Sequence, residues 1–123
     1  MKVLLFSGSH SRHVFVHELI LKNFDVCGVV VMERYCDVLR TTPSTLNSEQ
    51  TKQFIIDKKP DICFIFGTNL IGDNLIEVMP RLKINLHLGL SPWYRGSATL
   101  FWPFYNLQPQ FVGSTFHQII NEP

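Results

Sequence analysis

The chain has little charge and no excess of either sign. Its 11 Lys and Arg residues nearly balance 10 Asp and Glu residues, so that the formal net charge is +1. Proteins that bind nucleic acid through its phosphates normally carry a basic surface. The balance therefore argues against nucleic acid as a partner.

Long apolar runs and paired cysteines are also absent from the sequence. The longest apolar runs, residues 14–21 and 26–32, are much shorter than the roughly 20 residues that span a bilayer. The first 15 residues lack the layout of a secretory signal peptide, so we expect no membrane partner. Cys27, Cys36 and Cys63 have no spacing typical of a zinc or redox motif. Unpaired thiols are typical of a reducing compartment, which predicts a cytoplasmic protein.

The pattern of the remaining residues predicts one folded domain. A chain of 123 residues with 46% hydrophobic and 17% charged residues can bury a core. Apolar runs alternate with amphipathic segments, which is typical of a parallel sheet covered by helices. We therefore predict an α/β, Rossmann-like fold over residues 1–123, with a mostly parallel sheet flanked by helices and incomplete at the C-terminus.

The apolar runs and turn signals also give approximate element positions. Segment 34–47 is polar and is predicted to be irregular. The aromatic residues of the last predicted helix are expected to pack in the core, and Pro103 is expected to kink or restart that helix. Strands are predicted at 3–6, 26–31, 62–66, 82–87 and 112–119, and helices at 10–22, 48–58, 70–78 and 97–107.

The most informative segment covers residues 83–96. Asn85 and His87 are two residues apart near the end of a predicted strand, so they lie on one face, roughly 6.5–7 Å apart along the chain. An amide and an imidazole so placed can hold a small planar group between a hydrogen-bond donor and a proton-transfer group. The Gly/Pro/Arg-rich loop that follows is typical of a segment lining a binding cleft.

This segment resembles the folate-dependent formyltransferases, the family of the glycinamide ribonucleotide, methionyl-tRNA and amino-sugar formyltransferases. The family pattern is Asn-x-His, a short loop ending in Leu-Pro, and then an aromatic residue, a basic residue and Gly. Gly89, Leu90, Ser91 and Pro92 stand where Ser-Leu-Leu-Pro is usual. The matching residues are Asn85, Leu86, His87, Tyr94, Arg95 and Gly96.

The resemblance implies formyl transfer from 10-formyltetrahydrofolate to a primary amine, such as that of an amino-sugar nucleotide. Asn85 and His87 would be catalytic, with the amide donating to the developing oxyanion and the imidazole handling protons. No metal is expected, because His13 and His17, four residues apart, lack a third ligand. His117 is expected either to pack in its strand or to lie beside the pocket.

The resemblance also implies residues for the folate donor. A pterin ring needs a flat apolar slot with backbone donors and acceptors, and the segment after residue 66 occupies that place in the family. Thr68, Asn69 and Leu70 depart from the usual aromatic or Met followed by a basic residue, and the segment is alternatively a plain strand-to-helix turn. The predicted folate-binding residues are Gly67, Thr68, Asn69, Leu70, Ile71, Gly89, Leu90, Ser91 and Pro92.

The acceptor is expected to contact Gly8, Ser9, His10 and Arg95. The first three follow a strand and open a helix, a position that favours anions. The simpler alternative is that Ser9 or His10 caps the helix and that Arg95 is a surface residue. The turn is not the GxGxxG fingerprint, which disfavours a second alternative, a nucleotide-binding oxidoreductase.

The resemblance further implies a third catalytic group, an Asp that would come directly after Pro123. We therefore expect a C-terminally truncated formyltransferase domain whose transfer rate is lowered by orders of magnitude. The alternatives are an inactive remnant that serves as a binding or interaction module, and a methionyl-tRNA formyltransferase fragment, for which tRNA would be a partner. The acceptor and the oligomeric state stay open.

Overall fold

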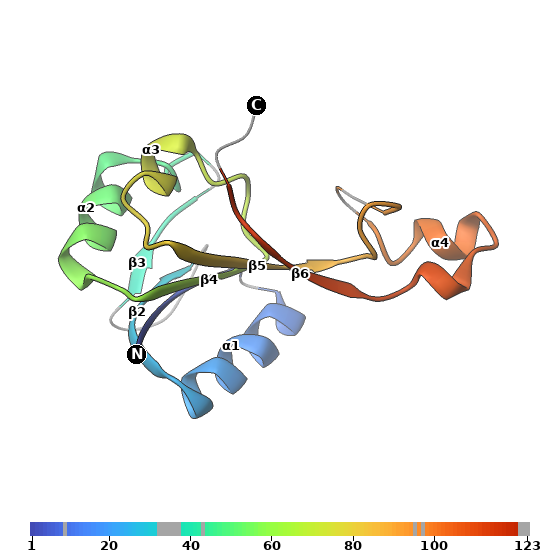
Figure 1. Cartoon of the computed structure of the whole chain (residues 1–123), viewed down its shortest axis with the longest axis horizontal. Helices are drawn as coiled ribbons and strands as arrows, with labels where there is room; N and C mark the ends of the chain where they lie inside the picture. The colour runs from blue at the N-terminus through green and yellow to red at the C-terminus, as the bar shows by residue number, and fades with distance from the viewer. Residues whose placement is uncertain (9, 32–37, 43, 95, 97, 121–123) are drawn as a thin grey trace.

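The computed structural model describes residues 1–8, 10–31, 38–42, 44–94, 96 and 98–120. These residues form a six-stranded sheet of order β3-β2-β1-β4-β5-β6, in which only β6 runs antiparallel to its neighbour (Figure 1). The Rossmann-like, mostly parallel α/β fold predicted from the sequence is thereby confirmed. The strands are β1 (Lys2–Ser7), β2 (Asp25–Val31), β3 (Val38–Arg40), β4 (Ile62–Phe66), β5 (Leu82–Leu88) and β6 (Ser114–Gln118). The helices are α1 (Ser11–Asn23), α2 (Glu49–Lys58), α3 (Asp73–Ile76), α4 (Trp102–Tyr105) and the short 3₁₀ helix η1 (Pro109–Phe111).

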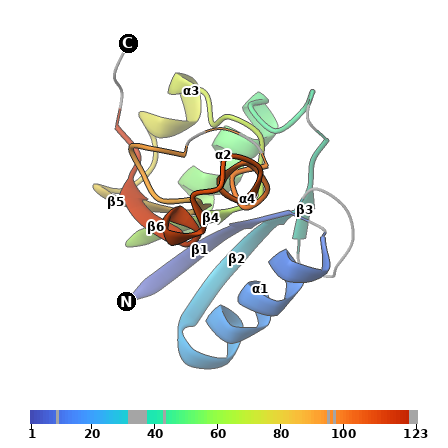
Figure 2. The same cartoon turned by 90° about the vertical axis from the view of Figure 1, so that its right-hand side faces the viewer.

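Helices cover both faces of the parallel part of the sheet. Figure 2 shows α1 on one face and α2 with α3 on the other. Side chains alternate along β1, so Leu4 and Phe6 join the core under α2 and α3, whereas Leu5 packs in a smaller cluster with Ile20 of α1. Burial on both faces explains why β1, β2 and β4 are nearly continuous apolar runs.

Three predicted elements differ from the observed ones. Segment 34–47 is not wholly irregular, because its residues Val38–Arg40 form β3 and pair with the end of β2. The helix predicted at 70–78 is reduced to α3, since Gly72 adopts an extended conformation at its N-cap. The helix predicted at 97–107 is reduced to α4, because Ala98 has a φ of 54° and Pro103 lies in the first turn.

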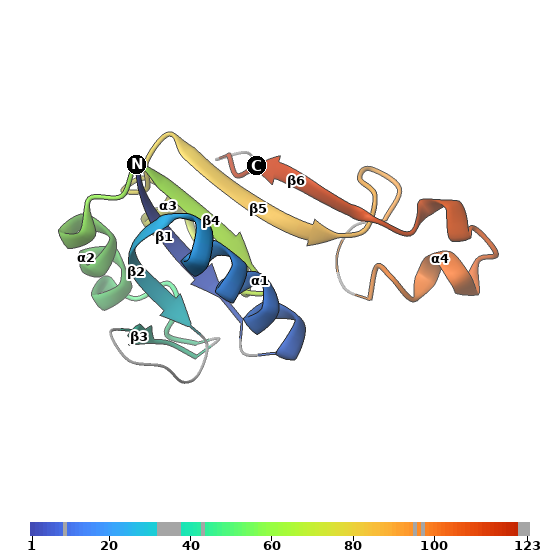
Figure 3. The same ribbon diagram turned by 90° about the horizontal axis from the view of Figure 1, so that it is seen from below.

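The aromatic side chains around α4 are not core residues, contrary to the prediction. In α4 only Pro103 is buried, because the segment projects from the body of the sheet and none of the described helices or strands packs over it (Figures 1 and 3). The aromatic rings therefore contact mainly each other, as in the stacked pair of Phe101 and Tyr105 at 5.9 Å. The exposed aromatic residues are Phe101, Trp102, Phe104 and Tyr105.

Two kinds of feature are absent from the described residues. No helix there is long and apolar enough to cross a membrane. Within the same part of the chain, no three His, Cys, Asp or Glu side chains gather closely enough to hold a metal ion.

The core under α2 and α3 should carry much of the stability. Leu4 is fully buried in that cluster, so Leu4→Ala is expected to lower the free energy of unfolding by about 2–5 kcal/mol, through lost burial and the cavity left behind. Urea denaturation gives the value. Leu21→Ala, at an exposed position of α1, is the control and should change it far less; equal losses would contradict this account of the core.

The buried thiol of Cys63 should be chemically inert in the folded protein. Burial, with a smaller contribution from nearby Cys27, raises the pKa of Cys63 to about 12, and the thiol rather than the thiolate therefore prevails at pH 8. We expect iodoacetamide to modify Cys63 more slowly than the half-buried Cys27, with the difference lost in urea. Mass spectrometry of peptides measures both rates, and equal rates in the folded protein would refute the prediction.

Candidate active site

Strand β5 loses one of its two neighbours at Asn85. This residue lies opposite Ile65 of β4 on one side and His117 of β6 on the other. Strand β4 ends one residue later and turns away at Gly67, which has a φ of 77°. Residues 86–88 therefore pair with β6 alone and leave the sheet as a two-stranded ribbon (Figure 3). The space that β4 vacates lies directly beside His87.

Asn85 is oriented by a histidine on the neighbouring strand. Asn85 Nδ2 lies 3.1 Å from His117 Nε2, and His117 Nδ1 lies 3.4 Å from the Gln118 carbonyl oxygen. A neutral imidazole with its proton on Nδ1 satisfies both contacts, since it donates to the carbonyl and accepts from the amide. His117, for which packing and a role beside the pocket were both open, thus contacts a candidate catalytic side chain.

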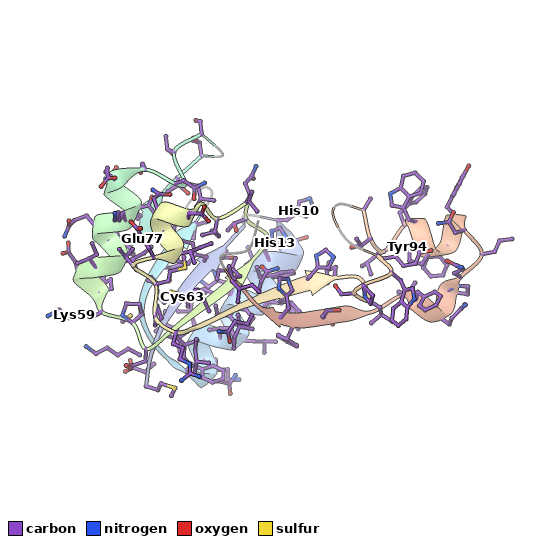
Figure 4. The ribbon with its side chains drawn as sticks, turned by 45° about the horizontal axis from the view of Figure 1, so that its top comes forward. His10, His13, Lys59, Cys63, Glu77 and Tyr94 are labelled. Atoms are coloured by element: carbon purple, nitrogen blue, oxygen red, sulfur yellow. The ribbon has the colours of Figure 1, made fainter. Side chains whose placement is uncertain are left out.

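His87 is oriented by the loop that follows its strand. His87 Nε2 lies 3.3 Å from the backbone carbonyl oxygen of Tyr94. A carbonyl oxygen only accepts, so the imidazole donates from Nε2, and in the neutral ring the lone pair is on Nδ1. The Tyr94 side chain points elsewhere, into the projecting segment (Figure 4), where its hydroxyl donates to Gln108 Oε1 at 2.6 Å.

Two clefts adjoin Asn85 among the described residues, and the first, of about 510 Å³, lies on its α3 side. Thr68, Asn69, Leu70 and Ile71, four of the predicted folate-binding residues, line it. Leu70 is 89% exposed, so at this position the cleft is open to solvent. Residues 68–71 belong to no helix or strand, so their main-chain groups take part in no helix or sheet ladder.

The second cleft, of about 410 Å³, lies beside the ribbon. Thr68 and Asn85 line both clefts, which places Asn85 at their junction. The second cleft alone contains His87. Its other lining residues include His13, Phe66, Gly67, Thr99 and Phe101.

Asn47 holds the segment that lines the first cleft. Its Nδ2 donates to the Leu70 carbonyl oxygen at 3.0 Å, and its Oδ1 accepts from the Gly72 N–H at 2.6 Å. Its own carbonyl oxygen accepts from Asn74 Nδ2 at 2.8 Å. Asn47 lies in the segment predicted to be irregular. The sequence did not reveal its role, because the hydrogen-bond partners of Asn47 are 23 to 27 residues away.

His13 is a further residue of the site that the sequence did not reveal. Only 8% of it is exposed, and its ring lies edge-on against Phe66 at 4.7 Å. A Cβ at Gly8 or at Gly67 would overlap this ring. The two glycines, at the ends of the adjacent strands β1 and β4, thus make room for an imidazole where the sheet order reverses, the usual ligand position in such folds.

Gly67, a further predicted folate residue, lines the second cleft, and the last four shape the loop after β5. These four are not among the described residues that line either cleft. The Gly89 N–H donates to the Gly113 carbonyl oxygen, and Thr115 Oγ1 both donates to the Gly89 carbonyl oxygen and accepts from the Ser91 N–H. The structure therefore places these residues in the turn that supports His87: Gly89, Leu90, Ser91 and Pro92.

The predicted acceptor residues are only partly described. The Gly8 N–H donates to the Phe66 carbonyl oxygen at 2.9 Å, which joins the ends of β1 and β4. His10 is the N-cap residue of α1 but makes no side-chain capping bond, and its ring lies 5.9 Å from that of His13 (Figure 4). Ser9 and Arg95 lie outside the described residues.

Comparison with known proteins identifies the fold of this chain. No protein-family model matches the chain. Phosphoribosylglycinamide formyltransferase from Bacillus halodurans matches 99% of this chain with a TM-score of 0.79 and 16% identity. The chain has the formyltransferase fold.

Two further proteins with the formyltransferase fold carry other activities. A sugar N-formyltransferase from a Shewanella species matches 99% of this chain with a TM-score of 0.68 and 20% identity. A formyltetrahydrofolate deformylase from Pseudomonas syringae matches 98% with a TM-score of 0.75 and 13% identity. The chain spans 73% of the Bacillus protein, 52% of the Shewanella protein and 46% of the Pseudomonas protein.

The fit of His13 between the two glycines can be tested by adding a methyl group. Gly67→Ala introduces an unfavourable positive φ and an overlap with the His13 ring. Gly96→Ala introduces only the former, because a Cβ there meets nothing within 4 Å. We expect Gly67→Ala to destabilise the protein by about 1–3 kcal/mol more than Gly96→Ala, as overpacking does.

Urea denaturation of both variants measures this difference. Removing the ring in the double variant Gly67→Ala/His13→Ala should recover part of the excess, because the two positions are in contact. Equal losses for Gly67→Ala and Gly96→Ala would show that the ring does not occupy the space between the strand ends.

Proposed function

We propose that this chain carries a formyl-transfer site that uses 10-formyltetrahydrofolate as donor and a primary amine as acceptor. The observation that carries the proposal is the position of Asn85, which lines both clefts. A donor in the cleft with Thr68 and an amine in the cleft with His87 would meet at this amide. The formyltransferase fold and the match of residues 85–87 and 94–96 to the family pattern support the same reaction class.

The amide of Asn85 is suited to stabilise negative charge on the oxygen of the formyl group. One N–H of its amide contacts His117, and a primary amide has a second N–H to donate. When the amine attacks, a carbon–nitrogen bond forms and negative charge develops on the formyl oxygen. A donor already oriented by its neighbour stabilises that charge without reorganisation.

The imidazole of His87 is suited to transfer the proton between the amine and the leaving nitrogen. The attacking amine loses one proton, and the folate nitrogen gains one as its bond to the formyl carbon breaks. With Nε2 donating to the Tyr94 carbonyl oxygen, the lone pair on Nδ1 can accept the first proton and return it to the leaving nitrogen.

The first cleft is the proposed place of the folate ring. Residues 68–71 would present main-chain donors and acceptors to the pterin, and Asn47 would keep them in place through its bonds to Leu70 and Gly72. Ile65 and Ile71 supply apolar surface in the same cleft. Such a combination of apolar walls and few fixed polar groups is typical of small-molecule sites.

The second cleft is the proposed place of the acceptor, an amino-sugar nucleotide or a similar metabolite in the cytoplasm. His13 lies beside this cleft and near His10, so the turn at Gly8 would face the end of the acceptor remote from its amine. An anionic group at that end would be compatible with the start of α1. The three compared proteins carry different activities, so they do not select one acceptor.

The proposal predicts a loss of turnover without a loss of folding. With 10-formyltetrahydrofolate and a panel of amines, Asn85→Ala should lower the rate by about 10²–10³-fold, as for a lost oxyanion donor. His87→Ala should lower it by about 10²–10⁴-fold, as for a lost acid–base group. Chromatography of tetrahydrofolate and of the formylated amine measures the rate, and equilibrium dialysis with 5-formyltetrahydrofolate measures binding.

Asn23→Ala is the matched control, because Asn23 binds only the end of α1 and lies in neither described cleft. It should change neither turnover nor binding. Folate binding without any turnover would favour the alternative of a non-catalytic binding module. A chain that neither binds the folate nor forms product would contradict both functions.

A further inference from the structure

His117 contacts a polar group with each of its ring nitrogens. Its Nε2 lies 3.1 Å from Asn85 Nδ2, and its Nδ1 lies 3.4 Å from the Gln118 carbonyl oxygen. An amide nitrogen only donates and a carbonyl oxygen only accepts, so both contacts require a neutral imidazole with its proton on Nδ1. The orientation of the Asn85 amide is therefore linked to the protonation state of His117.

The cationic form of His117 offers the Asn85 amide no acceptor. With a proton on Nε2 as well, this nitrogen and Asn85 Nδ2 are two donors directed at each other. Half a turn of the amide about its last side-chain bond removes the conflict, because Asn85 Oδ1 then accepts from Nε2. The same rotation carries both N–H groups of Asn85 to the side that Oδ1 occupied. Since Asn85 lines both clefts, one added proton changes which atom of its amide faces a molecule bound there.

Other titratable side chains lie near His117 on β5 and α3. On β5, the His87 ring centroid is 6.5 Å from that of His117, and Lys83 is two residues before Asn85, on the same face of the strand. Asp73 of α3 lines the first cleft together with His117. Of these side-chain types, the imidazole is the one that changes charge between about pH 5 and 8. A change at Asn85 in that range is therefore linked to the protons of His117 and His87.

We propose that His117 positions the Asn85 amide for formyl transfer only while its imidazole is neutral, so that the site requires two neutral histidines rather than one. The inference rests on the proposed function, in which Asn85 donates to the formyl oxygen and His87 accepts a proton from the amine. His87 must be neutral to accept that proton, and His117 must be neutral to keep an Asn85 N–H directed at the oxygen. In this role His117 acts through Asn85 and is a positioning residue.

Turnover of 10-formyltetrahydrofolate with an amine tests the proposal in two variants of His117. His117→Gln keeps, in place of Nε2, an acceptor that does not titrate, and His117→Phe keeps a flat ring without an acceptor. The rate of the unchanged chain is divided by that of each variant at every pH, so that the pH dependence of the amine and of His87 cancels. We expect the ratio to His117→Gln to be near one at pH 8 and to fall at least about tenfold by about pH 5, where imidazoles are mostly charged. The ratio to His117→Phe should exceed one at pH 8 and fall likewise.

Ser114→Ala is the matched control, because Ser114 is an exposed residue of β6 that lines neither described cleft. The ratio of the unchanged chain to this variant should stay near one over the whole pH range. A ratio to His117→Gln that is the same at both ends of the range, or that changes equally for Ser114→Ala, would overturn the proposal.

Nuclear magnetic resonance tests the positioning without any turnover. In the ¹⁵N-labelled chain, correlations across the imidazole show which ring nitrogen carries the proton, and the side-chain NH₂ signals of Asn85 report on the environment of its amide. We expect the His117 proton on Nδ1 at pH 8, and Asn85 signals that shift over the same pH range as the His117 ring and stop shifting in His117→Gln. A proton on Nε2, or Asn85 signals that ignore His117, would refute the positioning whatever the rates show. The expected signals without product at any pH would instead contradict the proposed function and leave the positioning confirmed.

Discussion

The arrangement of the candidate site depends on where strand β5 loses its parallel neighbour. Up to Asn85 this strand pairs with β4 and β6; after it, with β6 alone. The neighbour that is lost is β4, because this strand ends at Phe66 and the chain turns at Gly67. Both clefts adjoin this point, so Asn85 lies on the rigid sheet while His87 lies on the ribbon that leaves it. The gap in the pairing thus places both clefts beside Asn85.

The sequence predicts the elements whose signals are local. Four predicted strands, at 3–6, 26–31, 62–66 and 82–87, lie within one residue of the observed ends, because burial on a sheet selects apolar residues directly. The fifth, β6, lies within two residues of its prediction although it is mostly exposed. Strand β3 was missed, since its three residues are held by pairing with β2 rather than by a pattern of their own. The aromatic residues near α4 were misjudged because composition does not tell whether a second layer is present to cover them.

The same difference between local and long-range signals decides which residues of the candidate site could be predicted. The spacing of Asn85 and His87 is readable because a strand converts a two-residue interval into a shared face. The contributions of Asn47, His13 and His117 are not readable, because each contact joins segments distant in the sequence. The fold comparison extends over 99% of the chain at 16% identity, whereas the residue pattern lies within residues 85–96.

The two-stranded ribbon that carries His87 determines how far the imidazole lies from the Asn85 amide. Within a strand the separation of alternate residues is fixed by covalent geometry, so bending of the ribbon beyond residue 85 leaves the interval between the amide and the imidazole almost constant. What bending alters is the direction in which the imidazole faces the loop at residues 67–71. The amide and the imidazole are therefore held at a nearly constant spacing on one side of the second cleft, and Gly67 and Thr68 line the same cleft.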